Sequence, residues 1–318
     1  MNASLRSINA PVSRICNASF APSIILRNLG TLTLTTANIY AVMDGGAPVR
    51  TPWTGSLASR ATANVTLNNL STMAGRHTIK IYVTDPNVTT DCELTNDTLT
   101  TSFDYYPPVE LPLTEGFEGS TYPPQGWDIL NPDSYLTWET VTGVAKTGNA
   151  SVVMRNLQYE QNRPKDYLRF PLVNIATADS AFLSFQVAAA VQTDPSAAGN
   201  VWDTLQVLVS TDCGNTYTSL YKKWGNSLIT RKTAVTQSFV PTSTEWRKDS
   251  IDLTAYVGTG PIMLAFLNSS GFENNIYLDD INVYKVAINP NLRARGVLIT
   301  PNPTSGALTV QFYPIPLT

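Results

Sequence analysis

The sequence predicts an all-β protein made of two β-sandwiches and a short, incomplete β tail. Charged residues make up only 14% of the 318-residue chain, against roughly 25% in typical soluble domains, so long salt-bridged helices are not expected. Short segments rich in Thr, Val, Ile and Tyr alternate with turn signals, as residues that fit pleated sheets do. No stretch of eleven residues shows a convincing helical period of apolar side chains.

Residues 1–106 are expected to form the first sandwich. Asp44-Gly45-Gly46 is a strong hairpin signal, and the predicted strands lie at residues 23–27, 31–42, 64–67 and 77–83. Six or seven short strands with regular turn spacing are typical of an immunoglobulin-like sandwich. The segments that carry a family resemblance are 27–30, 53–57 and 74–78. They resemble bacterial immunoglobulin-like domains of the cell-adhesion-related type, which implies a fold but no ligand.

A proline-rich linker at residues 107–112 is expected to be extended and fairly stiff, and a larger domain follows at residues 113–286. Its predicted strands lie at residues 181–187, 204–209, 246–253 and 262–267. Its opening segments, Glu115 to Gly119 and Pro123 to Trp127, and its closing Tyr277-Leu278-Asp279-Asp280-Ile281 carry the resemblance. They resemble cleaved-adhesin and choice-of-anchor J domains, which implies a jelly-roll β-sandwich.

Residues 287–318 form the predicted tail. The rigid turn Pro301-Asn302-Pro303-Thr304-Ser305-Gly306 separates two apolar strands, which together make a hairpin-like unit. Residues 295–313 resemble the start of the C-terminal sorting domain of the type IX secretion system, and a proline-rich linker is the alternative. The resemblance implies secretion to the outer cell surface through the type IX machinery. Since Met1 to Phe20 lacks a signal peptide pattern, we expect a fragment cut at both ends.

Several function classes are excluded by composition. A net charge of -3 gives no electrostatic case for nucleic acid, and no run of 18 apolar residues could span a membrane. The one histidine, His77, cannot supply a two-histidine zinc site. A Ser-His-Asp triad would have to use His77, for which a structural position in a strand is expected instead. Acid pairs for glycoside hydrolysis are not singled out by any spacing.

The three cysteines are Cys16, Cys92 and Cys213. Cys16 and Cys92 lie near the two ends of the first domain, and the first and last strands of such a sandwich often lie close together. A disulfide between them is therefore one of two open readings, since sequence alone cannot fix connectivity. Cys213 lies in a turn and is expected to be a free or buried thiol rather than a nucleophile.

Acidic residues at the two ends of the jelly roll are the best metal candidates. Glu118 follows the first strand and Asp279 and Asp280 lie in the last one, and the first and last strands of a jelly roll commonly lie together. Converging carboxylates repel unless they are protonated or bridged by a hard cation such as calcium. The resemblance to adhesin-type jelly rolls implies a structural calcium at these residues, with Asp203 as a weaker addition. The alternative is that these acids cap turns in solvent.

Two further patterns carry a choice between chemistry and structure. Ser210 to Tyr217 matches the Asp-box pattern Ser-x-Asp-x-Gly-x-Thr-aromatic, and a single copy favours a hairpin brace over an active site. Trp138, Trp202 and Trp224 could form a sugar-stacking face, although tryptophans in a β-sandwich more often lie in the core. Trp127 is assigned to the core.

The preferred function is therefore a non-catalytic, secreted or surface-displayed adhesion module that binds a protein or glycan. The alternative is the accessory region of a secreted metallopeptidase whose catalytic domain lies upstream of Met1. A glycoside hydrolase on a jelly-roll scaffold is a third reading. Fold-level resemblance does not fix a ligand.

Overall fold

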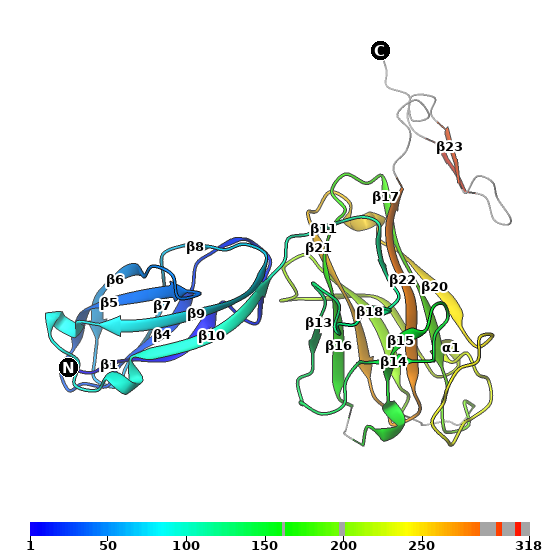
Figure 1. Ribbon diagram of the computed structural model, residues 1–318, viewed down its shortest axis with the longest axis horizontal. Coiled ribbons are helices and arrows are strands. Elements are labelled where there is room, and N and C mark those ends of the chain that lie inside the picture. Colours follow the sequence, from blue (N-terminus) through cyan, green and yellow to red (C-terminus); the bar gives the residue numbers. More distant parts are fainter. Residues whose placement is uncertain (161–162, 197–200, 287–296, 301–308, 313–318) are drawn as a thin grey trace, which may run out of the picture. The chain divides into compact units, whose positions relative to one another are not determined.

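A computed structural model describes residues 1–160, 163–196, 201–286, 297–300 and 309–312, and it confirms the all-β prediction (Figure 1). The chain divides into two compact units, residues 1–107 and 108–318. Helical turns within the described ranges are short: α1 (Gly225–Leu228), η1 (Pro86–Val88), η2 (Leu94–Asn96), η3 (Asn156–Gln158) and η4 (Thr254–Tyr256). No helix in these ranges is long and apolar enough to cross a membrane.

The first unit is a sandwich of two antiparallel sheets with a parallel edge. The smaller sheet has the order β1 (Ala3–Ala10), β4 (Ser23–Asn28), β7 (Thr62–Thr66). The larger has the order β2 (Arg14–Ile15), β10 (Thr98–Tyr105), β9 (Gly75–Thr84), β5 (Leu34–Met43), β6 (Val49–Leu57). A two-stranded pair joins β3 (Ser19–Phe20) and β8 (Leu70–Ser71). Alternate side chains of β4, including Ile24 and Leu26, are fully buried against Ile39, Ile79 and Ile81, as period-two patterning requires.

The predicted hairpin turn joins β5 and β6. Asp44 and Gly45 have φ angles of 51° and 72°, and the Gly46 amide donates to the Met43 carbonyl at 2.8 Å. Left-handed backbone at both central residues matches the twist of a β-hairpin, and Asp-Gly tolerates it better than other pairs. The turn signal read from the sequence is therefore confirmed.

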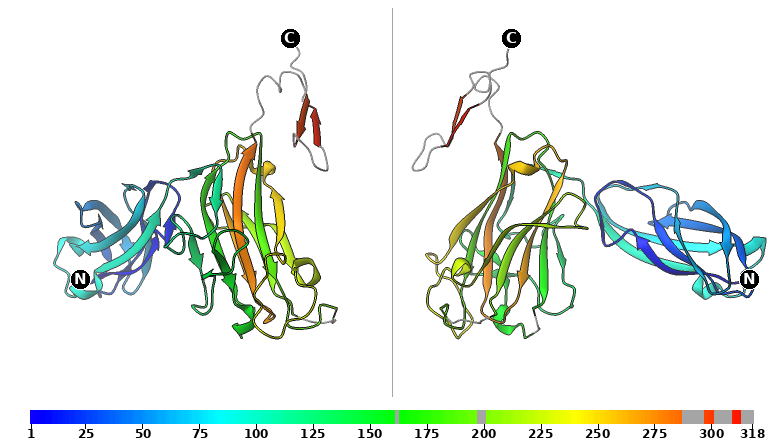
Figure 2. Two further views of the ribbon diagram at one scale, coloured as in Figure 1. Left: turned by 45° about the vertical axis from the view of Figure 1, so that its right-hand side comes forward. Right: turned by 180° about the vertical axis from the view of Figure 1, so that it is seen from behind.

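The second unit packs two larger sheets face to face (Figures 1 and 2). One has the order β11 (Val109–Glu110), β16 (Lys165–Asn174), β21 (Ile262–Ser269), β18 (Thr204–Ser210), β19 (Thr218–Trp224), with β13 (Asp128–Leu130) also on β16. The other has the order β14 (Glu139–Thr142), β15 (Ala150–Met154), β22 (Ile276–Val286), β17 (Ser180–Ala189), β20 (Arg247–Asp252), with β12 (Leu113–Glu115) also on β22.

An aromatic core fills the space between these two sheets. The ring centroid of Phe266 lies 5.4 Å from that of Phe170 and 4.9 Å from that of Phe185. The ring centroid of Trp127 lies 4.2 Å from that of Phe170. All four side chains are buried, and burying a residue of this size stabilises a fold by about 1.5–3 kcal/mol. The assignment of Trp127 to the core is confirmed.

β12 and β22, the first and last strands of the jelly roll predicted at residues 113–286, pair with each other, as expected of that fold. Glu115 of β12 lies opposite Ile281 of β22. A bulge interrupts β22 against β17, because Ser184 pairs with Asn282 and Gln186 with Asp279. Asp280 lies in this bulge with φ of 49°, and bulges of this kind redirect a side chain.

Part of the segment expected as a linker belongs to a sheet. Val109 and Glu110 form β11, which pairs in parallel with Val173 and Asn174 of β16. Proline is tolerated at the start of an edge strand because no partner needs its missing N–H. The extended backbone that Pro107 and Pro108 favour therefore also suits this strand.

The disulfide between Cys16 and Cys92, which the sequence left open, does not form, and the expectation of a free or buried thiol at Cys213 is wrong. Cys92 is an exposed free thiol, whereas Cys16 and Cys213 are disulfide-bonded. Cys92 precedes β10, and Ile15, next to Cys16, pairs with Tyr105 at the far end of that eight-residue strand. Eight residues at about 3.3 Å each separate the two sites by roughly 25 Å, far beyond the limit of about 7 Å between disulfide-linked Cα atoms.

The tail contains the predicted pair of strands. β23 (Val297–Thr300) and β24 (Thr309–Phe312) are antiparallel, with Val297 opposite Phe312. The Pro301 to Gly306 turn, and the segments before and after the two strands, lie outside the described residues. The sorting-domain assignment stays a prediction.

Candidate functional site

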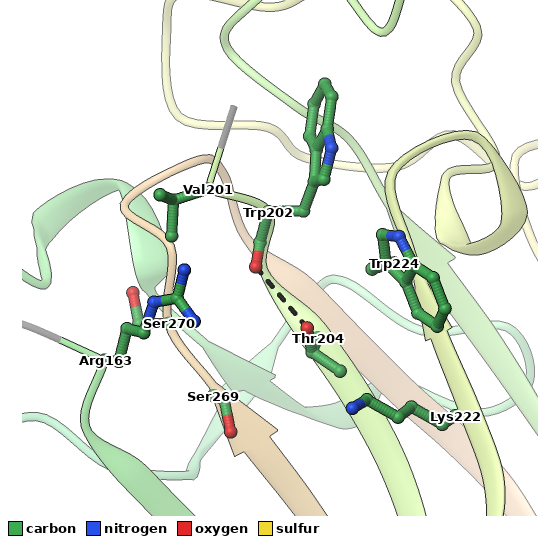
Figure 3. Close-up of a pocket in the computed structure, with 8 residues that line it drawn as sticks. All are labelled: Arg163, Val201, Trp202, Thr204, Lys222, Trp224, Ser269 and Ser270. Carbon is green, nitrogen blue, oxygen red and sulfur yellow. Dashed lines mark hydrogen bonds between the residues drawn. The ribbon is translucent and has the colours of Figure 1, made fainter. Parts of the chain in front are cut away.

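A hollow of about 260 Å³ lies at one end of the β16–β21–β18–β19 sheet, on the face away from the aromatic core (Figure 3). Strands β18, β19 and β21, the residue that follows β21, and the segments that precede β16 and β18 supply its walls. Its lining residues are Arg163, Val201, Trp202, Thr204, Lys222, Trp224, Ser269 and Ser270. The lining therefore combines indole rings, hydroxyl groups and two cationic side chains.

Cross-strand register explains why residues distant in sequence meet here. Thr204, the first residue of β18, lies opposite Ser269 of β21 on one side and Trp224 of β19 on the other. Residues directly opposite in antiparallel strands share a face of the sheet. Lys222 lies two residues before Trp224, so it shares that face as well. The alternate residues of β18, Leu205 and Val207, are buried in the core.

The two tryptophans are held in place by a tight turn. The Trp224 backbone N–H donates to Oγ of Ser227 at 3.0 Å, and that hydroxyl donates to the Trp224 carbonyl at 2.7 Å. Gly225 follows with φ of 49°. A Cβ at this position would lie 3.3 Å from the Trp202 ring, so the glycine lets that indole pack against the turn. Trp224 itself remains 48% exposed.

Asp203 fixes the loop behind the hollow. Its buried carboxylate accepts hydrogen bonds from the backbone N–H groups of Gly271, Glu273 and Asn274 at 2.6, 3.3 and 3.0 Å. Burial raises the pKa of Asp203 to about 7, although these amide donors oppose that shift. A Cβ on Gly271 would lie 2.2 Å from the Val201 carbonyl oxygen. The loop can therefore close over Asp203 only with glycine there.

Of the three tryptophans that could form a sugar-stacking face, although a core position is favoured for them, the structure brings two together. Trp202 and Trp224 line the hollow, as Figure 3 shows. Trp138 is 1% exposed in the core, and its indole Nε1 donates to the Asp166 carbonyl at 3.1 Å. The core position favoured for these tryptophans is therefore confirmed for Trp138, whose buried indole N–H needs only one partner, and is wrong for Trp224, which is 48% exposed. Arg163, Lys222, Ser269 and Ser270 were missed by sequence reasoning; only the Lys-x-Trp period of β19 could have indicated Lys222.

Three of the four predicted metal ligands meet at another loop, residues 146–150. Oδ2 of Asp279 accepts from the N–H groups of Lys146 and Thr147 at 2.6 and 3.1 Å. Oε1 of Glu118 accepts from the N–H groups of Asn149 and Ala150, both at 2.9 Å. Asp280 accepts from the Thr147 hydroxyl at 2.5 Å. Asp203, bound to its own loop, lies apart from this group.

These carboxylates suit a hard cation in their chemistry, but amide N–H groups face them in this structure. Asp279 is fully buried, and desolvation raises its pKa to about 6, with the charge of Asp280 adding to the shift. Across the described ranges, no three or more His, Cys, Asp or Glu side chains are arranged to hold a metal ion. Calcium needs six to eight oxygen ligands, so calcium binding stays a prediction.

The Asp-box segment is a hairpin brace, as predicted. Asp212 accepts from the Thr216 N–H at 2.9 Å and from its hydroxyl at 2.6 Å. The Gly214 N–H donates to Oγ of Ser210 at 2.8 Å. The hydrogen bonds that Asp212 accepts, first from the Thr216 hydroxyl and then from the Ser210 hydroxyl, lower its pKa to about 2. The segment turns the chain from β18 into β19 and thereby helps to place Trp224.

His77 of β9 lies in a small hollow with Asp44 and Ser71. A catalytic triad needs Nε2 of the histidine to accept the serine proton. Here Nε2 lies 2.9 Å from the Met73 carbonyl oxygen and Nδ1 lies 2.6 Å from the Asp44 carboxylate. Because a carbonyl only accepts, Nε2 acts as a donor. The arrangement agrees with the structural role expected for His77.

No protein-family model matches the chain, and no curated protein matches it either. Among solved structures, it is similar to the K1 cleaved adhesin domain of Lys-gingipain from Porphyromonas gingivalis W83, at 18% identity and a TM-score of 0.39 over 56% of this chain and 99% of that one. It is also similar to the K2 cleaved adhesin domain of Lys-gingipain, at 20% identity and a TM-score of 0.39 over 54% of this chain and 99% of that one. The structure of TmCBM61 in complex with β-1,4-galactotriose is similar at 15% identity and a TM-score of 0.36, over 54% of this chain and 94% of that one.

Proposed function

We propose that this chain is a non-catalytic binding module that holds a saccharide against Trp224 and Trp202. The observation that carries the proposal is the exposure of Trp224 at 48%, beside a second tryptophan, in a hollow lined by hydroxyl groups. Burying an indole ring of this size would stabilise the folded state. A large ring left in solvent is instead suited to a ligand with an apolar face.

A sugar ring supplies the matching surface. Its C–H groups form an apolar face for an indole, and its hydroxyl groups lie around the rim. The hydroxyls of Thr204, Ser269 and Ser270 and the cations of Lys222 and Arg163 supply polar groups at the same place. Concave sites with a few convergent polar groups around apolar walls are the usual form of ligand sites.

Export to the cell surface is the second part of the proposal. The disulfide bonds of Cys16 and Cys213 support it, since disulfides persist in oxidising compartments outside the cytosol. Display through the type IX machinery would use the tail that contains β23 and β24. The test is protease accessibility of the full chain on intact cells, compared between cells with and without that machinery. Equal surface labelling in both would reject this route.

Calcium at the 146–150 loop is the third part. The burial of Asp279 and the charge of the adjacent Asp280 support it, because a cation would offset their repulsion. The residues that would hold it are Glu118, Asp279 and Asp280. The ion would brace the first and last strands of the jelly roll, at a distance in the chain from the tryptophans.

Saccharide binding is tested with the full chain on a glycan array, followed by calorimetry on the best oligosaccharide. Trp224→Ala should weaken binding by tenfold or more, a loss of about 1.4 kcal/mol, with an unchanged melting temperature. Tyr135→Ala is the matched control, since that ring is 53% exposed and does not line the hollow. Binding that survives Trp224→Ala, or no binding to any glycan, would overturn the proposal.

A further inference from the structure

The charges around the hollow indicate which saccharide it takes. Resting on the saccharide site proposed above, we infer that the ligand is an acidic sugar, whose carboxylate or sulfate group lies between Arg163 and Lys222 while its ring packs on Trp224. The shared chemistry is an anionic substituent on a sugar ring. It is the cations of the lining, rather than its tryptophans, that select this class over neutral sugars.

Two cations line the hollow and a third lies on the same row of the sheet. Arg163 and Lys222 are lining residues, and Figure 3 shows their side chains on opposite sides of Thr204. Lys165 of β16 lies opposite Ser269, which in turn lies opposite Thr204. All three cationic side chains are exposed. Among the described residues of the lining, none carries a carboxylate.

These cations are unpaired, which sets them apart from others in the same unit. Within the described residues, Arg163, Lys165 and Lys222 form no ion pair with a carboxylate. The arginines that pair with acids elsewhere in the unit are Arg155, Arg169, Arg231 and Arg247. In a chain of net charge -3, three unpaired cations around one hollow make a local positive field suited to an anion.

Asp203 and Glu273, the acids beside the loop behind the hollow, form no ion pair with these cations within the described residues. The Asp203 carboxylate accepts hydrogen bonds from three backbone N–H groups of the loop behind the hollow. Glu273 in that loop accepts from the N–H groups of Gln192 and Thr193 and from the Thr193 hydroxyl. Both acids are buried. Their carboxylates hold the loops and leave Arg163 and Lys222 open to an anion that the proposed ligand supplies.

The ammonium group of Lys222 lies close to the ring of Trp224. Nζ of Lys222 lies 5.8 Å from the centroid of the Trp224 ring, within the range of a cation–π contact. A sugar stacked on Trp224 would therefore place substituents of its rim within reach of this ammonium group. Arg163 adds a planar guanidinium, whose paired N–H groups match a carboxylate or a sulfate.

The experiment compares matched pairs of probes by calorimetry on the full chain. A galacturonate trisaccharide is compared with its methyl ester, which keeps the sugar and removes the charge. A sulfated galactan oligosaccharide is compared with its desulfated form, so that carboxylate and sulfate are distinguished. Arg163→Gln, Lys222→Gln and the double variant remove the cations. Lys80→Gln is the matched control, since Nζ of Lys80 lies 5.7 Å from the Tyr82 ring, a similar contact in the first unit.

We expect at least one acidic probe to bind tenfold or more tightly than its neutral partner, and the advantage to fall as salt rises. Each single charge variant should reduce that advantage several-fold, the double variant should abolish it, and Lys80→Gln should keep it. Equal affinity for both members of each pair, lost only in Trp224→Ala, would overturn the acidic ligand and leave the saccharide site standing. Failure of every saccharide to bind would reject both.

Discussion

Nδ1 of His77 lies 2.6 Å from Oδ2 of Asp44 in the first unit. Since Nε2 of the same ring faces the Met73 carbonyl, both nitrogens face acceptors, and only the doubly protonated imidazolium satisfies both. Burial lowers the pKa of His77, but the hydrogen bonds to Asp44 and Met73 outweigh it, so that the net pKa is raised. The link joins the β5–β6 turn to the segment before β9.

The stability of the first unit should therefore depend on pH. A raised pKa in the folded state adds stability that is fully present below the unfolded value near 6.5 and is lost as pH rises through the folded value. We expect a loss of about 0.2–1 kcal/mol, the range of a partly exposed pair. Urea unfolding between pH 5 and 9 measures it. His77→Gln should flatten the dependence over this window, and an unchanged slope in that variant would contradict the assignment.

The buried carboxyl group of Asp166 should destabilise the second unit when it is ionised. Neither carboxylate oxygen accepts a hydrogen bond within the described residues, although the hydroxyls of Thr137 and Tyr159 lie nearby, and burial raises its pKa to about 6. An acid with a raised pKa loses stability as pH rises from its unfolded value, near 3.8, to its folded value. Asp166→Asn should therefore stabilise the second unit by about 1–3 kcal/mol at pH 8.

The control for Asp166→Asn is Asp212→Asn in the exposed Asp-box. Because hydrogen bonds lower the pKa of Asp212 to about 2, its contribution is present above the unfolded value and is lost as pH falls toward 2. This variant should therefore destabilise the chain at neutral pH. Thermal melts at pH 4 and pH 8 separate the two. If Asp166→Asn melted below the wild-type chain at pH 8, the account of an uncompensated buried charge would be wrong.

Thiol titration tests the cysteine assignment. Unfolded without reductant, the chain should give one reactive thiol, that of Cys92, because Cys16 and Cys213 are disulfide-bonded. The folded chain should give the same thiol, since Cys92 is exposed. Cys92→Ser should give none, and reduction should then release two. A thiol on Cys16 or Cys213 in the unreduced chain, located by peptide mapping, would refute the assignment.

Local signals predicted the strands well, because apolar and polar residues alternate along a strand that buries one face. The segment 77–83 alternates, and it lies within β9 with Ile79, Ile81 and Val83 buried. Asp44-Gly45 likewise carries its turn in its own backbone preference. β11 could not be predicted in this way, since its place depends on pairing with Val173 and Asn174, more than sixty positions later.

The site depends on non-local register even more strongly. Trp138 and Trp224 are both tryptophans with polar neighbours in sequence, yet one is 1% and the other 48% exposed. What separates them is which strands lie opposite, and this follows from sheet order. Thr204 meets Trp224 and Ser269 only because β18 lies between β19 and β21. The carboxylates of Glu118 and Asp279 could be placed together because the pairing of first and last strands is a property of the expected fold.

The loop at residues 146–150 gives the last prediction. If calcium binds Glu118, Asp279 and Asp280, chelation should lower the melting temperature of the second unit by several degrees, since a ligand that binds only the folded state adds stability by mass action. Added calcium should restore it. Asp279→Asn should make the melt insensitive to chelator, whereas Asp203→Asn, at a different loop, should keep that sensitivity. An identical melt in chelator and in calcium would mean that the amide N–H groups of Lys146, Thr147, Asn149 and Ala150 compensate these charges without a cation.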